Sequence, residues 1–135
     1  MSRKDILETL RRHGVSPTAQ RIEVAEVLLG RPQHLSADQI LDKLKATGSR
    51  VSKATVYNSL NLFSEKGLVR EINVDPTRKF YDSTTHAHHH FYHVDTGELV
   101  DIANDRVSIP DLPPLPLGTE KESVEVLIRI RNKQR

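Results

Sequence analysis

The spacing of apolar residues changes at Gly67, and this change constrains the fold more than any other feature of the sequence. Before it, four segments repeat apolar residues every three to four positions, which is typical of helices packed on a core. A glycine follows each of them, as expected at a helix end: Gly14, Gly30, Gly48 and Gly67. After it, residues 68–74 and 79–82 are typical of strands, separated by the turn Asp75-Pro76-Thr77. The chain is therefore expected to have an α+β fold.

Helices followed by a hairpin form the layout of a winged helix-turn-helix domain. In such a domain the fourth helix, which Ser52 would cap, enters the major groove of DNA. The hairpin then forms a wing against the DNA backbone. A small α+β domain without a DNA partner has the same pattern, so the pattern alone leaves both interpretations open. We expect this first domain to cover residues 1–83.

A second domain is expected over residues 84–135, after the polar segment Ser83-Thr84-Thr85, which is a candidate hinge. Two short strands flank a turn at residues 95–97, and residues 124–131 alternate in the manner of a half-buried strand. Residues 109–117 hold four of the seven prolines, which excludes a regular helix or central strand there. So small a sheet is hard to stabilise alone, and we expect a homodimer.

Charge is divided unevenly between the two halves. Residues 1–83 carry 14 Lys and Arg and 10 Asp and Glu, a balance of +4. Residues 84–135 carry 6 basic and 8 acidic side chains, a balance of −2. A basic first half fits contact with nucleic acid, although many ordinary domains share it.

Histidines are concentrated in one short stretch, HAHHHFYH. Five of the seven histidines lie within its eight residues: His86, His88, His89, His90 and His93. Imidazole is a common ligand of transition metals and of haem iron, so the stretch indicates metal or haem chemistry. If it is a strand, His88 and His90 point to one face and His89 and His93 to the other. A solvated polar strand is the alternative.

The composition excludes several kinds of protein. The chain has 135 residues, of which 36% are apolar and 28% charged, and it has no cysteine. It can therefore form no disulfide and no thiolate zinc site, and a bound metal must use nitrogen and oxygen ligands. No apolar run approaches the length of a membrane span, and the first residues do not resemble a secretion signal. These features predict a cytoplasmic protein without a membrane partner.

Several motifs together carry a resemblance to a known family. Over nearly its whole length the chain closely resembles the ferric uptake regulator superfamily. Four motifs carry the resemblance, in this order: SPTAQRIEV, PQHLSADQIL, SKATVYNSLNLFSEKGLV and FYDSTTHAHHHFYHVDTGELVDI. The HHHFY run, the missing cysteines and the short tail look most like the iron response regulator branch. The resemblance implies a dimeric, metal- or haem-responsive transcription factor. Residues 1–83 would be its winged-helix domain, and residues 84–135 its α/β dimerisation and sensing domain.

A regulatory metal site follows from the same resemblance. The matching positions are His34, Asp82, His88, His90 and Asp101. Three imidazoles and two carboxylates suit Fe²⁺, Mn²⁺ or Zn²⁺. His34 lies in the DNA-binding half, whereas His88 and His90 lie in the other, so metal is expected to fix the angle between the halves. From the residues alone, His34 could also be an exposed loop histidine, and Asp82 could cap the hairpin.

The chain departs from the family pattern where the family has cysteines. The first CxxC pair of the family's structural zinc site corresponds to His93 and Thr96, and the second pair is absent. No four-cysteine structural zinc is therefore expected. Asn58 and Asp82 resemble the peroxide-sensing branch, so a peroxide sensor that works through iron-catalysed histidine oxidation is an alternative.

Haem is a second candidate cofactor. The resemblance to the iron response regulators makes His88, His89 and His90 the candidate ligands, with His86 and His93 as candidate partners. The chain has no Cys-Pro haem motif. If haem is a ligand, a haem-delivering protein becomes a further candidate partner. Histidine clusters also bind haem adventitiously, so the sequence leaves a physiological role open.

Double-stranded DNA is the main partner that the resemblance implies. Tyr57 resembles the base-reading tyrosine of the family, although a core aromatic is the alternative. The other candidate DNA contacts are Arg12, Arg21, Lys53, Thr55 and Asn58, which could reach phosphates or base edges. The expected operator is an A·T-rich inverted repeat.

Taken together, the sequence predicts a metal- or haem-responsive regulator of iron homeostasis that is not an enzyme. Two other classes compete with this prediction. In a metal-dependent hydrolase the metal would activate water, but we find no separate nucleophile or general base near the histidines. A metal-buffering protein would use the same ligands, but it has no need of a winged-helix half.

Overall fold

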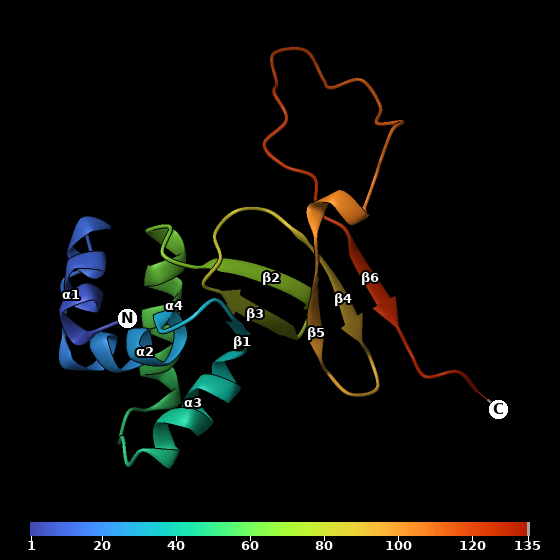
Figure 1. Cartoon of the computed structure of the whole chain (residues 1–135). Helices are drawn as coiled ribbons and strands as arrows, with labels where there is room; N and C mark the ends of the chain where they lie inside the picture. Colours follow the sequence, from blue (N-terminus) through green and yellow to red (C-terminus); the bar gives the residue numbers. More distant parts are fainter. Residues whose placement is uncertain (135) are drawn as a thin grey trace. The chain divides into compact units, whose positions relative to one another are not determined.

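The computed structural model describes residues 1–134, which fall into two compact units, Met1–Thr85 and His86–Arg135 (Figure 1). The first unit contains four helices and a three-stranded sheet, and the second contains a separate three-stranded sheet. The α+β class that the sequence predicts is confirmed. The first unit extends to Thr85, two residues beyond the predicted end of the first domain at residue 83.

Side-chain caps set the starts of the helices in the first unit. The helices are α1 (Arg3–Arg12), α2 (Ala19–Leu29), α3 (Ala37–Ala46) and α4 (Lys53–Glu65). Each begins after a residue whose hydroxyl accepts a backbone N–H: Ser2, Thr18, Ser36 and Ser52. Helix α1 begins at Arg3, because Ser2 and Asp5 form a capping box there.

The core of the first unit joins the four helices to the base of the sheet. Val24, Leu28, Ile40, Val56 and Phe63 have no exposed surface. They belong to one cluster that also includes Leu68, Val69 and Tyr81 from the segment after α4. This cluster contains no candidate metal ligand, so the first unit can fold around apolar contacts alone.

The sheet of the first unit has the strand order β1-β3-β2 and is antiparallel throughout. Its strands are β1 (His34–Leu35), β2 (Arg70–Asp75) and β3 (Arg78–Asp82). The hairpin of β2 and β3 matches the prediction, whereas β1 was not predicted, because two residues carry no readable alternation. In the pairing of β1 with β3, His34 lies opposite Asp82.

The sheet of the second unit has the order β5-β4-β6. Strand β4 (His89–His93) pairs antiparallel with β5 (Leu99–Ile102) and parallel with β6 (Leu127–Ile130). A short 3₁₀ helix, η1 (Asn104–Arg106), follows β5. The predicted last strand is wrong in extent, because only Leu127–Ile130 pairs with β4. Ile128 and Ile130 on that strand are each 38% exposed.

Candidate metal centre and nucleic-acid interface

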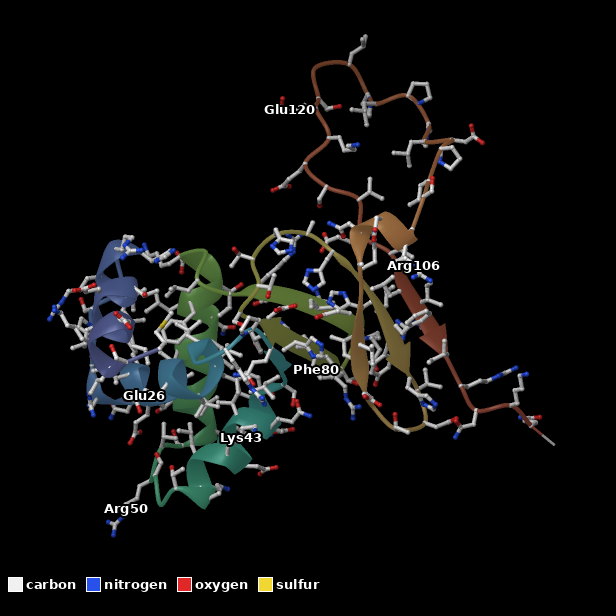
Figure 2. All side chains as sticks on the ribbon, viewed as in Figure 1. Glu26, Lys43, Arg50, Phe80, Arg106 and Glu120 are labelled. Atoms are coloured by element: carbon white, nitrogen blue, oxygen red, sulfur yellow. The ribbon has the colours of Figure 1, made fainter. Side chains whose placement is uncertain are left out.

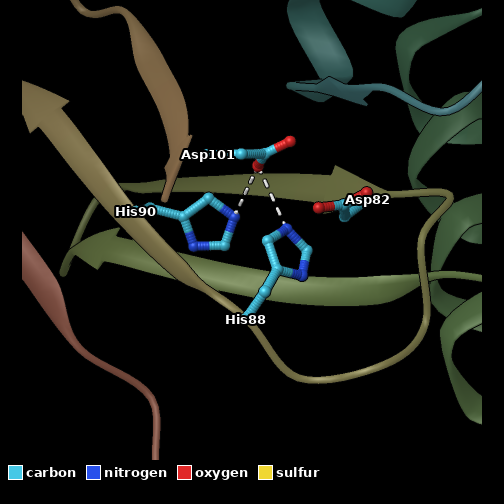
Figure 3. A group of neighbouring side chains, drawn as sticks. All are labelled: Asp82, His88, His90 and Asp101. Atoms are coloured by element: carbon cyan, nitrogen blue, oxygen red, sulfur yellow. Dashed lines mark hydrogen bonds and ion pairs between the residues drawn. The ribbon is translucent and has the colours of Figure 1, made fainter. Parts of the chain in front are cut away.

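Two histidines of the second unit converge on one carboxylate oxygen. The Nε2 atom of His88 lies 3.0 Å from Oδ1 of Asp101, and the Nε2 atom of His90 lies 3.2 Å from the same oxygen (Figure 3). The histidine side chains are almost buried, at 10% and 5% exposure, whereas the Asp101 side chain is 60% exposed. One ligand atom from each of the three residues lies within 4.8 Å of the others. This spacing brings three metal-binding groups around one point.

Strand register explains this convergence. His90 on β4 is the direct partner of Asp101 on β5, so the two side chains stand on the same face of the sheet. His88 comes immediately before β4 and two residues from His90, and the two rings lie with centroids 4.4 Å apart. The alternation predicted for His88 and His90 therefore brings both rings to one side.

The hydrogen bonds of His88 involve both nitrogens of its ring. Its Nδ1 atom lies 3.0 Å from the carbonyl oxygen of His86. A carbonyl can only accept, so Nδ1 carries the proton. Its Nε2 atom is within hydrogen-bond distance of the Asp101 carboxylate, to which a protonated ring would donate, whereas a neutral ring would offer its Nε2 lone pair to a bound metal. Metal-binding histidines characteristically donate the other ring N–H to a carbonyl in this way.

The first unit holds a second pair of candidate ligands. His34 and Asp82 are direct partners across β1 and β3, so their side chains share a face. Asp82 is only 1% exposed, and its Oδ1 accepts the N–H of Thr84 at 2.8 Å. A buried carboxylate must be balanced by hydrogen-bond donors or by a cation.

Ser83 joins the end of β3, beside Asp82, to the segment before β1 through hydrogen bonds within the first unit. Its N–H donates to the carbonyl of Gln33 at 2.9 Å, and its Oγ accepts the N–H of Gln33 at 3.0 Å. Its hydroxyl also lies 3.1 Å from the carbonyl oxygen of Arg31. These bonds tie β3 to the segment that leads into His34. The prediction of a hinge at residues 83–85 stays a prediction.

The other three clustered histidines have different surroundings. His89 accepts the N–H of Val126 at its Nδ1 atom, at 2.8 Å, so that nitrogen is occupied by the link between β4 and β6. His86 is exposed, with its ring centroid 5.6 Å from that of His88. Haem binding by these histidines stays a prediction. If His89 binds haem iron, it can do so only through Nε2.

His93 takes part in a set of hydrogen bonds that we call the clip, formed by His93, Asp95, Thr96 and Asn132. The Nδ1 atom of His93 accepts the N–H groups of Asp95 and Thr96, both at 3.2 Å. Its Nε2 atom therefore carries the proton, which it donates to Oδ1 of Asn132 at 2.9 Å. The N–H of Asn132 donates in turn to Asp95 at 2.8 Å. The clip ties the segment after β6 to the turn between β4 and β5.

Sequence reasoning missed two residues beside these groups. Arg70 on β2 is the strand partner of Asp82 on the side opposite His34, and its guanidinium donates to the carbonyl of Thr85 at 3.3 Å. Asn132 anchors the clip. Only strand register and tertiary contacts reveal either role, because an isolated Arg or Asn carries no distinguishing pattern in the sequence.

The candidate DNA-reading surface centres on the start of α4. Tyr57 is 37% exposed, which disfavours the alternative that it is a core aromatic. The Nζ atom of Lys53 lies 5.9 Å from the centre of the Tyr57 ring and 3.0 Å from Oδ1 of Asp38. The hydrogen bond to Asp38 raises the pKa of Lys53. Lys53 therefore has a fixed acidic neighbour on α3.

The remaining candidate DNA contacts occupy two places. One surface depression is lined by Thr18, Gln20, Arg21, Thr55, Asn58 and Ser59. Within it, the guanidinium of Arg21 donates to the carbonyl of Ser16 at 2.9 Å. Arg12 lies at the exposed end of α1 and does not line this depression. The structure thus groups Arg21, Thr55 and Asn58 and leaves Arg12 apart.

Comparison with protein families identifies the chain. A model of the ferric uptake regulator family matches residues 12–111. The chain belongs to this family. The peroxide operon regulator of Bacillus subtilis (strain 168) is 38% identical to this family member over 98 residues, which cover 73% of this chain and 68% of the relative. The peroxide-responsive repressor of Staphylococcus saprophyticus is 33% identical over 98 residues, which cover 73% of this chain and 66% of that relative.

Solved structures of ferric uptake regulators share the fold. The regulator from Pseudomonas aeruginosa, determined with manganese, has a TM-score of 0.70 and 26% identity, with 94% of this chain and 97% of that chain covered. The regulator from Vibrio cholerae has a TM-score of 0.72 and 24% identity, with 93% and 98% covered. At this identity, the similarity to the Vibrio cholerae regulator shows a shared fold and nothing more. The α+β architecture with an N-terminal helix-turn-helix unit is therefore that of the family.

Membership of the ferric uptake regulator family fixes the general class of the chain. The relatives are named as transcriptional regulators, so the chain is a metal-responsive transcriptional regulator and not an enzyme. The assignment to the iron response regulator branch stays a prediction. Among residues 1–134, no helix is long and apolar enough to cross a membrane.

Proposed function

We propose that this protein is a homodimeric regulator of iron homeostasis that binds an A·T-rich inverted repeat and responds to a divalent metal. The observation that carries the proposal is the convergence of His88 and His90 on one oxygen of Asp101. Family membership supports the regulatory role, and the nitrogen and oxygen donors suit Fe²⁺, Mn²⁺ or Zn²⁺. A DNA-binding regulator of this kind would work in the cytoplasm.

The proposed regulatory site uses ligands from both units. His88, His90 and Asp101 would supply three ligands from the second unit, and His34 and Asp82 two from the first. A bound metal would contribute Lewis acidity and charge neutralisation. The chain contributes orientation, because His86 holds the His88 ring through Nδ1 and strand pairing aligns His34 with Asp82. Occupancy would then favour one arrangement of the two units.

Direct metal binding tests the site. We expect His88→Ala and His90→Ala each to weaken Mn²⁺ binding by at least about tenfold in calorimetry, as expected when a ligand is lost. His86→Ala is the matched control, because it keeps the carbonyl that accepts from His88 and should bind Mn²⁺ like the wild type. Equal affinity for all three variants and the wild type would contradict the proposed site.

The coupling between units is tested by His34→Ala. This variant should still dimerise and melt cooperatively, because His34 lies outside the apolar core. It should nevertheless lose most of the metal dependence of operator binding in gel-shift titrations. If it responds to Mn²⁺ or Fe²⁺ as the wild type does, the coupling is wrong and the histidines act within the second unit alone.

DNA reading is tested with two variants of the first unit. Tyr57→Ala should weaken operator binding by about 1 to 3 kcal/mol with little effect on random DNA, as expected for a base contact. Arg21→Ala should weaken binding to both DNAs and reduce the salt slope by about one unit, as expected for a phosphate contact. Equal losses on operator and random DNA for Tyr57→Ala would contradict its role.

Peroxide sensing is a second candidate, favoured by the names of the relatives, which are peroxide regulators. With iron bound, hydrogen peroxide would add one oxygen atom to a ligand imidazole and release water. Intact mass and peptide mapping after treatment with Fe²⁺ and peroxide should then find the added oxygen on His34 or His88. Mn²⁺-loaded protein is the control and should stay unmodified.

Haem binding can be tested separately with the same histidine variants. If haem is a ligand, His86→Ala should alter the haem absorption spectrum while leaving Mn²⁺ binding intact. His89→Ala should likewise keep the metal response, because its Nδ1 already accepts from Val126. A haem spectrum unchanged by every histidine variant would indicate adventitious binding.

A further inference from the structure

A long exposed segment leaves the sheet of the second unit between η1 and β6. We call residues 108–123 the arm. It contains no helix or strand, and every one of its residues is exposed. Three leucines lie on it with 46%, 52% and 102% exposure: Leu112, Leu115 and Leu117. Figures 1 and 2 show the arm looping away from β4, β5 and β6.

The arm is far longer than its connection requires. His89 pairs with Ile102 at the end of β5, and His90 pairs with Leu127 at the start of β6, so the arm leaves and returns at the same end of the sheet. The strands it joins are separated by one strand, a distance of about 10 Å, which three or four residues would span. Connections this long without secondary structure are uncommon in compact domains and are usually functional.

Prolines limit what the arm can do. Pro110, Pro113, Pro114 and Pro116 fix much of its backbone and remove four N–H donors. The arm therefore cannot join a sheet as a regular strand. A proline-rich segment instead presents its side chains from a stiff, extended backbone, which loses little conformational entropy on binding. Its contacts must be made by leucine side chains.

The sheet of the second unit also leaves apolar side chains uncovered. Phe91 is paired with Val100 on one side and with Ile128 on the other, so these three side chains form a row on one face. They are 37%, 44% and 38% exposed. Ile130, on the same face two residues after Ile128, is 38% exposed. We call these four residues the apolar face, and it is the face opposite His90 and Asp101.

We propose that the arm of one chain packs on the apolar face of a second copy, and that the second copy returns the same contact. The proposal rests on the homodimer of the proposed function. It adds the segments that form the contact. Exposed leucines on a stiff arm and an exposed apolar face within one unit are complementary, and reciprocal exchange satisfies both through a two-fold axis.

Charge supports the same pairing. The arm carries Asp111, Glu120 and Glu122 against one cation, Lys121. The segment that follows β6 carries Arg131 and Lys133 and has no acidic residue. An acidic arm and a basic strand end attract each other when they belong to different copies, which favours the exchanged contact over contact between two like arms.

Engineered cysteines test the exchange, because the chain has none of its own. We expect the double variant Leu115→Cys with Val100→Cys to form a disulfide-linked dimer under mild oxidation, seen on a non-reducing gel. The control pair is Leu115→Cys with Arg129→Cys, because Arg129 pairs with Tyr92 and so lies on the opposite face. A monomer with an internal disulfide, or a dimer that forms no faster than in the control, would overturn the proposal.

A second measurement separates this proposal from the homodimer itself. Leu115→Asp would place an uncompensated charge in the contact and should raise the dimer dissociation constant by at least about tenfold in light scattering. Ser108→Ala, a change on the same arm that alters neither a leucine nor a charge, should leave a dimer. A wild-type protein that is monomeric overturns the dimeric function. A dimer that Leu115→Asp does not weaken keeps that function and overturns the role of the arm.

Discussion

The role of a histidine in this protein depends on which of its ring nitrogens contacts which partner. His88 and His89 are neighbours in sequence, yet His88 donates from Nδ1 to a carbonyl, whereas His89 accepts an N–H at the same atom. The first arrangement turns Nε2 toward the Asp101 carboxylate at the candidate metal centre. The second uses the ring to hold β6 against β4. Identical residues in one run therefore divide between the candidate metal centre and sheet stabilisation.

Asp38 gives a prediction at the surface of the first unit. Its carboxylate pairs with Lys53 at 3.0 Å, and both side chains are largely exposed. Asp38→Asn should free Lys53 for phosphate contact, strengthening binding to random DNA more than to the operator and steepening the salt dependence by about one unit. Asp42→Asn, an exposed change on the same helix, is the control. Fluorescence anisotropy at several salt concentrations measures both, and equal effects would contradict the role of Asp38.

Asp75 gives a prediction of pH dependence. Hydrogen bonds from the N–H and hydroxyl of Thr77, both at 2.9 Å, lower the pKa of Asp75 from its ordinary 3.8. Because the folded-state pKa is depressed, the stabilisation is fully present above pH 3.8 and is lost as the pH falls through the folded-state value. The protection of the Thr77 amide, measured as its exchange rate relative to that of an unfolded peptide at the same pH, should fall over that range. In Asp75→Asn this pH dependence should disappear, and its persistence would contradict the assignment.

At the level of elements, helices were more predictable than strand partners. Apolar spacing and hydroxyl caps mark α2, α3 and α4 in the sequence, because both signals are local. The strand β1 and the parallel pairing of β6 with β4 could not be predicted, because each depends on contacts between residues far apart in the chain. The candidate metal site likewise has one part that local sequence predicts and one part that depends on distant contacts. The alternation of His88 and His90 is readable, whereas the pairing of His34 with Asp82 requires the register.

The clip predicts how the end of β6 is stabilised. Asn132→Ala would remove the bond from Nε2 of His93 and should destabilise the protein by about 0.5 to 1 kcal/mol, as expected for one partly exposed hydrogen bond. Amide exchange of Val94, whose N–H donates to Ile130, should also quicken. Lys133→Ala, on the neighbouring residue, is the control. If the two variants exchange at equal rates, the clip does not hold β6.

At the scale of the whole molecule, folding and sensing use separate sets of residues. The apolar cluster of the first unit contains no candidate metal ligand, and the chain has no cysteine with which to build a thiolate zinc site. The free energy of metal binding therefore adds to stability only through occupancy of the folded state.

Chelation tests this separation. Prolonged treatment with EDTA should leave the helical circular dichroism spectrum unchanged and lower the melting temperature only by the amount that ligand linkage predicts. Operator binding should lose its dependence on added metal until Mn²⁺ is restored. Loss of helical structure on chelation would contradict the separation, because it would show that a metal is required for the fold.

The clip has a further consequence for the life of the protein in a cell. Its bonds come from His93, Asp95, Thr96 and Asn132, so the turn and the last strand are held together by the chain's own atoms. None of these four residues is a ligand of the proposed regulatory site, so a cell that runs short of metal should leave the turn and the last strand joined.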